Sequence, residues 1–135
     1  MTQEEKNLLL KDLCARLPYG VKCQHFKDKT PYALLGIDED VLHIDCPVYD
    51  EGDGYVEIEY CKPYLRPMSS MTEEEKETYR IIIKSLLENS VTNNIATLYN
   101  FLNSKHLDYN GLIHLGLAIE VAKENNPYEK EQKEK

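Results

Sequence analysis

The stretch YALLGIDEDVLHIDC, residues 32–46, predicts the centre of the fold. Its two apolar runs, 32–37 and 41–46, are separated by the acidic triplet at 38–40. Two apolar runs joined by a short polar connection are typical of a β-hairpin, because the turn stays in water while both strands contribute to a core. We therefore expect an antiparallel strand pair with a short acidic loop.

Two further strands are expected on either side of this hairpin. Residues 21–26 alternate between apolar and polar side chains, and Val56, Ile58 and Tyr60 alternate with glutamates. Pro63 and Pro67 then predict an extended connector, because proline fixes its own backbone and restricts the residue before it. Consecutive strands joined by short turns favour an antiparallel meander.

Helices are expected before and after the strands. Residues 3–17 carry an apolar stripe at helical spacing, and Thr2 with Glu5 has the form of a capping box. Pro18 should end this helix. The stripe consists of Leu9, Leu10, Leu13, Cys14 and Leu17.

The second half of the chain predicts further helices. Thr72 and Glu75 form another capping box at the start of the second, and residues 95–102 indicate a third. Asp108 could cap a last short helix that runs through residues 112–115. From residue 123 onward no apolar periodicity remains, so the tail is expected to be disordered or a frayed helix.

The predicted fold class is α+β. An N-terminal helix precedes a roughly four-stranded antiparallel meander, and two or three C-terminal helices pack on one face of the sheet. We expect residues 1–122 to form one globular domain and residues 123–135 to form a charged tail.

Length and charge exclude several classes of function. The chain has 135 residues and a net charge of -8, which argues against direct, phosphate-driven binding to nucleic acid. No apolar run approaches the roughly 18 residues of a membrane span, and the N-terminus is charged rather than built like a secretory signal. We therefore expect a cytoplasmic protein that does not bind membranes.

The negative charge is concentrated in residues 38–59. This segment holds nine acids and no Lys or Arg, which leaves 15 acids against 16 basic residues elsewhere. The nine are Asp38, Glu39, Asp40, Asp45, Asp50, Glu51, Asp53, Glu57 and Glu59. The segment either solvates turns and an edge strand or attracts a basic partner.

Tyrosine is the second compositional feature, with ten Tyr against two Phe and no Trp. Because tyrosine is amphipathic and enriched at interfaces, an acidic, tyrosine-bearing strand surface would suit recognition of a basic protein patch. Tyrosines that merely edge the core are the alternative. The candidate binding surface consists of Asp45, Asp50, Glu51, Asp53, Tyr55, Glu57 and Glu59.

Catalytic candidates are few, and no catalytic residue or cofactor is assigned. Cys23 and His25 share a strand face without needing to touch, and Asp45 could orient His43. The even number of cysteines could suggest disulfides, but without a secretory signal we expect a reducing compartment and buried thiols. Common nucleotide, hydrolase and metalloprotease motifs are absent.

A metal site is not predicted either. Asp45, Asp50, Asp53 and His43 could supply ligands for a hard cation. However, aligning Gly54 with the glycine of a calcium loop places Tyr49 where the first aspartate belongs.

Three stretches resemble a known group of proteins. They are KDLCARLPYGV at 11–21, KPYLRPMSSMT at 62–72, and FLN at 101–103 with Asp108-Tyr109 and Gly111-Leu112-Ile113. They are similar to small proteins of unknown function from gut anaerobes, often encoded in prophages or mobile elements. The resemblance implies an accessory role and no known catalytic activity. Arg16 and Arg66, within these stretches, either bridge to acids or are exposed.

Three functional hypotheses follow. The leading one is a non-enzymatic protein-interaction module that presents its acidic strand surface to a basic protein partner. The second is an inhibitor that mimics nucleic-acid charge on a DNA-binding protein. The third is a small enzyme that uses His25 or His43 with nearby acids or a thiol. The sequence leaves the oligomeric state open.

Overall fold

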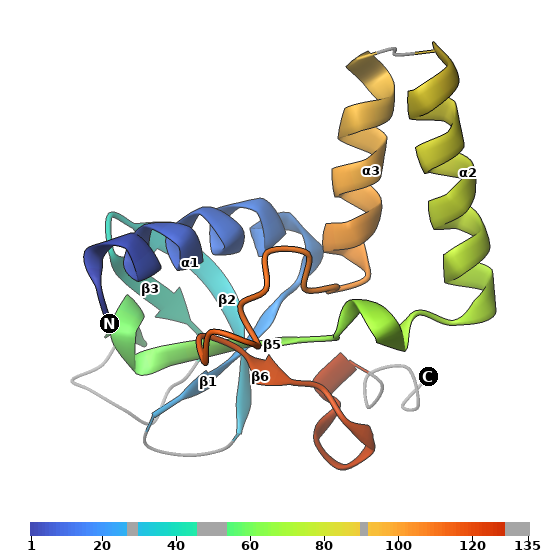
Figure 1. Ribbon diagram of the computed structural model, residues 1–135. Helices are drawn as coiled ribbons and strands as arrows, with labels where there is room; N and C mark the ends of the chain where they lie inside the picture. The colour runs from blue at the N-terminus through green and yellow to red at the C-terminus, as the bar shows by residue number, and fades with distance from the viewer. Residues whose placement is uncertain (27–29, 46–53, 90–91, 129–135) are drawn as a thin grey trace.

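The computed structural model describes residues 1–26, 30–45, 54–89 and 92–128 (Figure 1). The first part of the chain contains α1 (Gln3–Arg16), β1 (Lys22–His25), β2 (Pro31–Asp38), β3 (Val41–Ile44), β4 (Tyr55–Glu57) and β5 (Cys61–Leu65). The second part contains α2 (Glu73–Asn89), α3 (Thr92–Ser104) and β6 (Ile119–Glu120). The α+β class is therefore confirmed.

The strands form one mixed six-stranded sheet in the order β4-β3-β2-β1-β5-β6. The first four strands pair as an antiparallel meander, and β5 adds to β1, also antiparallel. Strand β6 pairs with β5 in the parallel direction. The expected four-stranded sheet is therefore too small. The expected strand at 56–60 is also shorter, because residues 58–60 form a 3₁₀ turn.

Strand β5 occupies the segment predicted to be an extended connector. Its central proline, Pro63, lies opposite Cys23 in the register with β1. On the other side, β6 pairs only with Tyr64 and Leu65, so proline interrupts no ladder there. The partner of β5 arrives more than 50 residues later in the chain, which local pattern analysis does not detect.

Helix α1 covers one face of the sheet, and the hydrophobic core lies between them (Figure 1). Leu9 and Leu13 of α1 are fully buried against strand residues such as Leu42 and Ile44. The loop after α3 adds Leu112 to the same core. Burying each of these side chains contributes about 1.5–3 kcal/mol.

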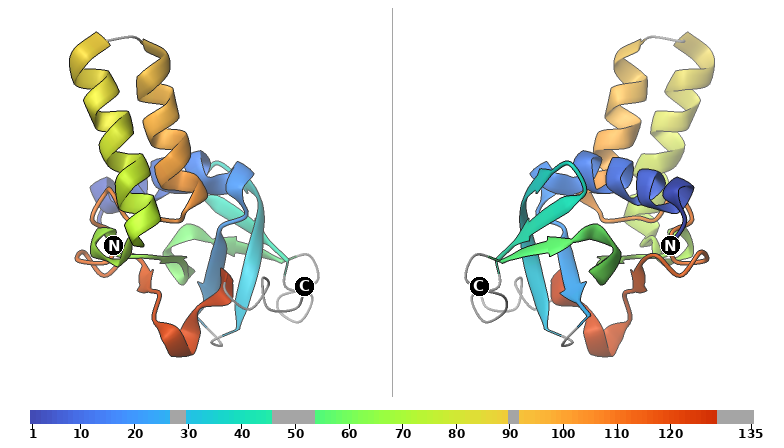
Figure 2. Two further views of the ribbon diagram at one scale, coloured as in Figure 1. Left: turned by 90° about the vertical axis from the view of Figure 1, so that its right-hand side faces the viewer. Right: turned by 90° about the vertical axis from the view of Figure 1, so that its left-hand side faces the viewer.

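The two long C-terminal helices do not pack on the sheet as expected. Helices α2 and α3 pack against each other and project from the body as a hairpin, which is visible in all views (Figures 1 and 2). The apolar stripe of α2, including Ile82, Ile83 and Leu86, is half-buried. The two helices shield their stripes only in part, since Leu87, Ile95 and Tyr99 remain exposed.

The predicted helix boundaries agree with the structure at two capping boxes. Thr2 Oγ1 accepts from the Glu5 amide at 3.0 Å, and the Glu5 carboxylate accepts from the Thr2 amide at 2.9 Å. Thr72 and Glu75 repeat this exchange at the start of α2. These reciprocal bonds satisfy backbone donors that the first helical turn leaves open.

The expected last helix is absent from residues 105–118, which form turns. Asp108 still caps the segment, since its carboxylate accepts from the amides of Leu112 at 2.8 Å and Ile113 at 2.9 Å. Gly111 and Gly116 have φ values of 75° and 77°, a left-handed conformation that interrupts a right-handed helix.

The described part of the expected tail lies against the body. Pro127 is buried, and the Tyr128 hydroxyl donates to the Tyr64 carbonyl at 2.7 Å and accepts from the Lys22 amide at 2.9 Å. The domain boundary after residue 122 stays a prediction. Within the described ranges, no helix combines the length and apolar character needed to cross a bilayer.

Candidate functional site

The predicted acidic surface is partly visible in the structure. Asp45, Tyr55, Glu57 and Glu59 are all exposed, whereas Asp50, Glu51 and Asp53 lie outside the described residues. The exposed turn between β2 and β3 adds further acids. We define the acidic edge as Asp38, Glu39, Asp40, Asp45, Tyr55, Glu57 and Glu59.

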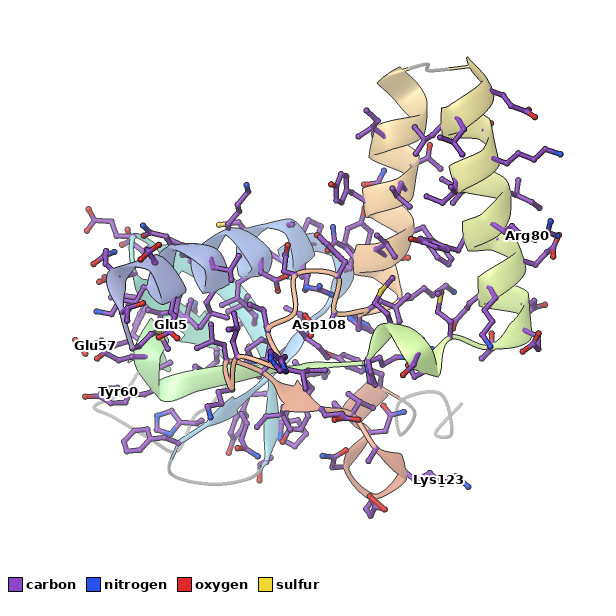
Figure 3. The ribbon with its side chains drawn as sticks, in the orientation of Figure 1. Glu5, Glu57, Tyr60, Arg80, Asp108 and Lys123 are labelled. Atoms are coloured by element: carbon purple, nitrogen blue, oxygen red, sulfur yellow. The ribbon has the colours of Figure 1, made fainter. Side chains whose placement is uncertain are left out.

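Sheet register gathers most of these acids at one end of the molecule. Val41 pairs with Glu57, and the Ile58 amide donates to the Asp40 carbonyl at 3.0 Å, so the β2–β3 turn lies beside the end of β4. Figure 3 shows Glu57 at this end together with Glu5 of α1. Asp45, the remaining acid of the acidic edge, lies apart from the others at the opposite end of β3.

One acid of the edge has a cationic partner. Lys6 Nζ lies 3.2 Å from the Glu59 carboxylate, and both side chains are partly exposed. An exposed pair of this kind contributes about 0–1 kcal/mol. The remaining described acids of the edge form no ion pair with a described Lys or Arg, so their negative potential is largely uncompensated.

Exposed aromatic rings lie close to the acids. Tyr55 is 51% exposed and stacks on His43, with ring centroids 4.5 Å apart and planes at 17°. Phe26 and Tyr60 form a second exposed pair at 4.9 Å. Aromatic rings that remain half in water offer rigid contact area to a partner.

Sequence reasoning did not single out Phe26. Side chains of β1 alternate between the interior and the solvent, and Cys23 and His25 are the buried ones. Position 26 therefore falls on the solvent side, and Phe26 is 61% exposed. Because strand side chains alternate between two faces, a buried Cys23 in the sequence would have placed Phe26 on the solvent side.

Strand β4 forms the outer edge of the sheet. Among the described residues it pairs only with β3, and Tyr55 and Glu57 point outward while Val56 is buried. An outer strand exposes backbone donors and acceptors that another extended segment can pair with. The aromatic and acidic side chains thus flank a potential pairing edge.

A buried ion pair lies within α1, outside the acidic edge. Asp12 and Arg16 of α1 were expected between the apolar positions, yet their side chains are completely buried, with Nε–Oδ2 at 2.7 Å. Asn110 donates to Asp12 at 2.8 Å, and Arg16 donates to the Leu107 carbonyl at 2.6 Å. Arg66 likewise forms an ion pair with Glu75. Arg16 and Arg66 therefore both bridge to acids, which was one of the two alternatives expected from the sequence.

This pair fixes α1 to the foot of the helical hairpin. The Arg16 guanidinium lies 5.0 Å from the centre of the Tyr109 ring, whose hydroxyl donates to Asn103 at the end of α3. Burial raises the pKa of Tyr109. The network connects α1 to the end of α3. In the sequence, Asp12 and Arg16 are four residues apart and neighbour Leu9 and Leu13 on the helix surface. This spacing could have indicated an ion pair on the buried side of α1.

The catalytic alternatives receive no support from the cysteines. Cys23 is fully buried, and its hydrogen bond to Cys61, with burial, raises the pKa of the Cys23 thiol. A nucleophilic cysteine needs the opposite shift. Burial of all four thiols was expected, but Cys14 is exposed because it lies on the solvent side of α1. Cys46 lies outside the described residues.

Metal-binding side chains do not converge in the part of the chain that the structure describes. No group of three His, Cys, Asp or Glu residues there could hold an ion. Of the ligands considered from sequence, Asp50 and Asp53 lie outside that part. His43 faces Tyr55 instead of a carboxylate.

A cleft opens on the side of the molecule away from the acidic edge. It lies between the foot of α2, the end of α3 and the C-terminal segment, and its volume is about 510 Å³. Basic side chains outnumber acidic ones in its lining.

Comparisons of the chain with protein-family models, with curated proteins and with solved structures found no match.

Proposed function

We propose that this protein is a non-enzymatic interaction module that binds a basic segment of another protein through the acidic edge. The observation that carries the proposal is the exposure of acids and aromatic rings together on and beside an outer strand, with one described ion pair among them. The resemblance noted in the sequence supports an accessory role in a phage or mobile element.

Physical chemistry favours a partner that is positively charged and extended. Uncompensated carboxylates raise the association rate with a cationic partner, and salt weakens this effect. The edge of β4 offers backbone pairing, and the Tyr55 ring offers contact area. Charge thus selects the partner, and the strand orients it.

The proposal is tested with a soluble, extended Lys- and Arg-rich peptide as probe. In the edge variant, Asp38→Asn, Glu39→Gln, Asp40→Asn and Glu57→Gln remove four charges. A matched control neutralises four exposed acids elsewhere: Glu74→Gln, Glu88→Gln, Glu120→Gln and Glu124→Gln. Both variants have the same net charge, so they separate a local surface from overall attraction.

We expect the edge variant to bind the peptide about tenfold more weakly, from four exposed interactions of about 0.4 kcal/mol each. Backbone amide shifts in an NMR titration should be largest in β3 and β4 and should shrink with added salt. Equal losses in the two variants would refute the proposal.

Mimicry of nucleic-acid charge remains the second hypothesis, and it makes a stricter demand. A partner bound by the acidic edge must then release the protein when double-stranded DNA is added. Competition by DNA, but not by an uncharged polymer, would favour this alternative over a general interaction module.

A further inference from the structure

The cleft away from the acidic edge is formed by three segments that are distant in sequence. Residues 66–75 form one wall, residues 104–106 a second, and residues 121–128 a third. Figure 3 shows Lys123 on this side of the molecule, and Glu57 and Tyr60 at the other. A volume of about 510 Å³ falls within the usual range for small-molecule sites.

The two charged residues that line the first wall, Arg66 and Glu75, are paired with each other. Arg66 donates to both Glu75 carboxylate oxygens, at 2.7 and 3.0 Å. Its other donors reach the Ser70 hydroxyl, the Ser70 carbonyl and the Lys105 carbonyl. All five guanidinium N–H groups are therefore used within the protein, and this side chain builds the cleft rather than binding a ligand.

The opposite walls contribute two lysine ammonium groups. Lys105 and Lys123 both line the cleft, and neither forms an ion pair with a described residue. With Glu75 paired to Arg66, these two ammonium groups leave the lining with two positive charges. A positive hollow in a chain of net charge -8 is a local feature that overall composition does not predict.

An aromatic stack completes the cleft. His106 has a left-handed backbone, with φ of 60°, and its ring stacks on Tyr128 with centroids 3.7 Å apart and planes at 9°. Tyr128 is also hydrogen-bonded to β1 and β5, so the stack is anchored to the sheet. The cleft is thus lined by an aromatic stack and two lysine side chains.

We propose that this cleft binds a small organic anion that carries a phosphate or carboxylate group. Lys105 and Lys123 supply the positive charge that attracts the anionic group, and the carbon framework contacts the His106–Tyr128 stack. The cleft is larger than a bare phosphate needs, which favours an organic ligand. This proposal is independent of the function proposed for the acidic edge.

The test is an NMR titration of the full chain with ribose 5-phosphate, citrate and inorganic phosphate, each up to about 10 mM at constant ionic strength. The cleft variant carries Lys105→Ala and Lys123→Ala. The matched control carries Lys11→Ala and Lys84→Ala, two exposed lysines outside the cleft. Amide spectra of both variants without ligand verify that the fold is intact.

We expect saturable shifts at residues 104–106 and 121–126 with at least one organic anion. Affinity should fall at least about tenfold in the cleft variant and stay unchanged in the control, because charged hydrogen bonds are lost only in the former. Ribose 5-phosphate and citrate distinguish a phosphate ligand from a carboxylate ligand. Binding of inorganic phosphate alone, equal weakening in both variants, or no saturable shift with any probe would overturn the proposal.

Discussion

The buried pair of Asp12 and Arg16 provides the sharpest prediction about stability. Replacing Asp12 with alanine leaves a guanidinium without its counter-charge in a site where both side chains are completely buried. Removing one partner of such a pair costs about 3–5 kcal/mol. The hydrogen bond from Asn110 is lost as well, which adds about 1 kcal/mol.

We expect Asp12→Ala to lower the free energy of unfolding by about 4–6 kcal/mol. This corresponds to a fall in Tm of roughly 10–25 °C for a chain of this size. Urea denaturation followed by circular dichroism measures the loss. Glu59→Ala, which breaks the exposed pair with Lys6, is the matched control and should cost less than about 1 kcal/mol.

A double variant separates charge from packing. Asp12→Leu with Arg16→Met removes both charges and refills the volume, so it should recover much of the stability that the single change loses. A loss in Asp12→Ala no greater than that in the Glu59→Ala control would refute the reasoning. A double variant as unstable as the single one would assign the cost to packing rather than to an uncompensated charge.

Three further predictions concern pH, thiol exposure and the C-terminal segment. The hydrogen bond from Arg66 lowers the pKa of Glu75 below 4.5. The ionised carboxylate therefore stabilises the fold above pH 4.5, and this contribution is lost as the pH falls through the lowered pKa. The Tm difference between the natural chain and Glu75→Gln should shrink between about pH 6 and pH 3, and a constant difference would contradict this. In the folded chain, iodoacetamide should label the exposed Cys14 within minutes and leave the buried Cys23 unlabelled until urea is added. Peptide mass spectrometry measures the labelling of each cysteine. Equal labelling of the two would be inconsistent with the burial of Cys23. Tyr128→Phe removes two hydrogen bonds to the sheet and should lower the free energy of unfolding by about 1–3 kcal/mol in urea titrations, whereas an unchanged midpoint would mean that the segment does not contribute.

Local features of the chain were predicted well. The hairpin of β2 and β3 follows from two apolar runs around an acidic turn, and α1 and α2 begin at their capping boxes. In each case the deciding interactions join residues only a few positions apart. The acids of the β2–β3 turn and of β4 were likewise identifiable, because charge and exposure at turns and edges are local properties.

Features that depend on distant parts of the chain were not predicted. Strand β5 has a proline in its middle and gains its second neighbour only when β6 returns. Asp12 and Arg16 belong by residue type on the outside of a helix, and their hydrogen-bond partners Asn110 and Leu107 lie more than 90 residues away in the chain. The cleft joins three segments that no local pattern connects.

The helical hairpin leaves and rejoins the body at neighbouring points. Arg66 and Leu107 form a parallel bridge, in which the Arg66 amide donates to the His106 carbonyl and the Asp108 amide donates to the Arg66 carbonyl, both at 2.8 Å. An insertion whose two ends already touch can lengthen or shorten with little entropic cost to the remaining chain. Beyond its foot, the hairpin can therefore vary in length while the sheet beneath it keeps its structure.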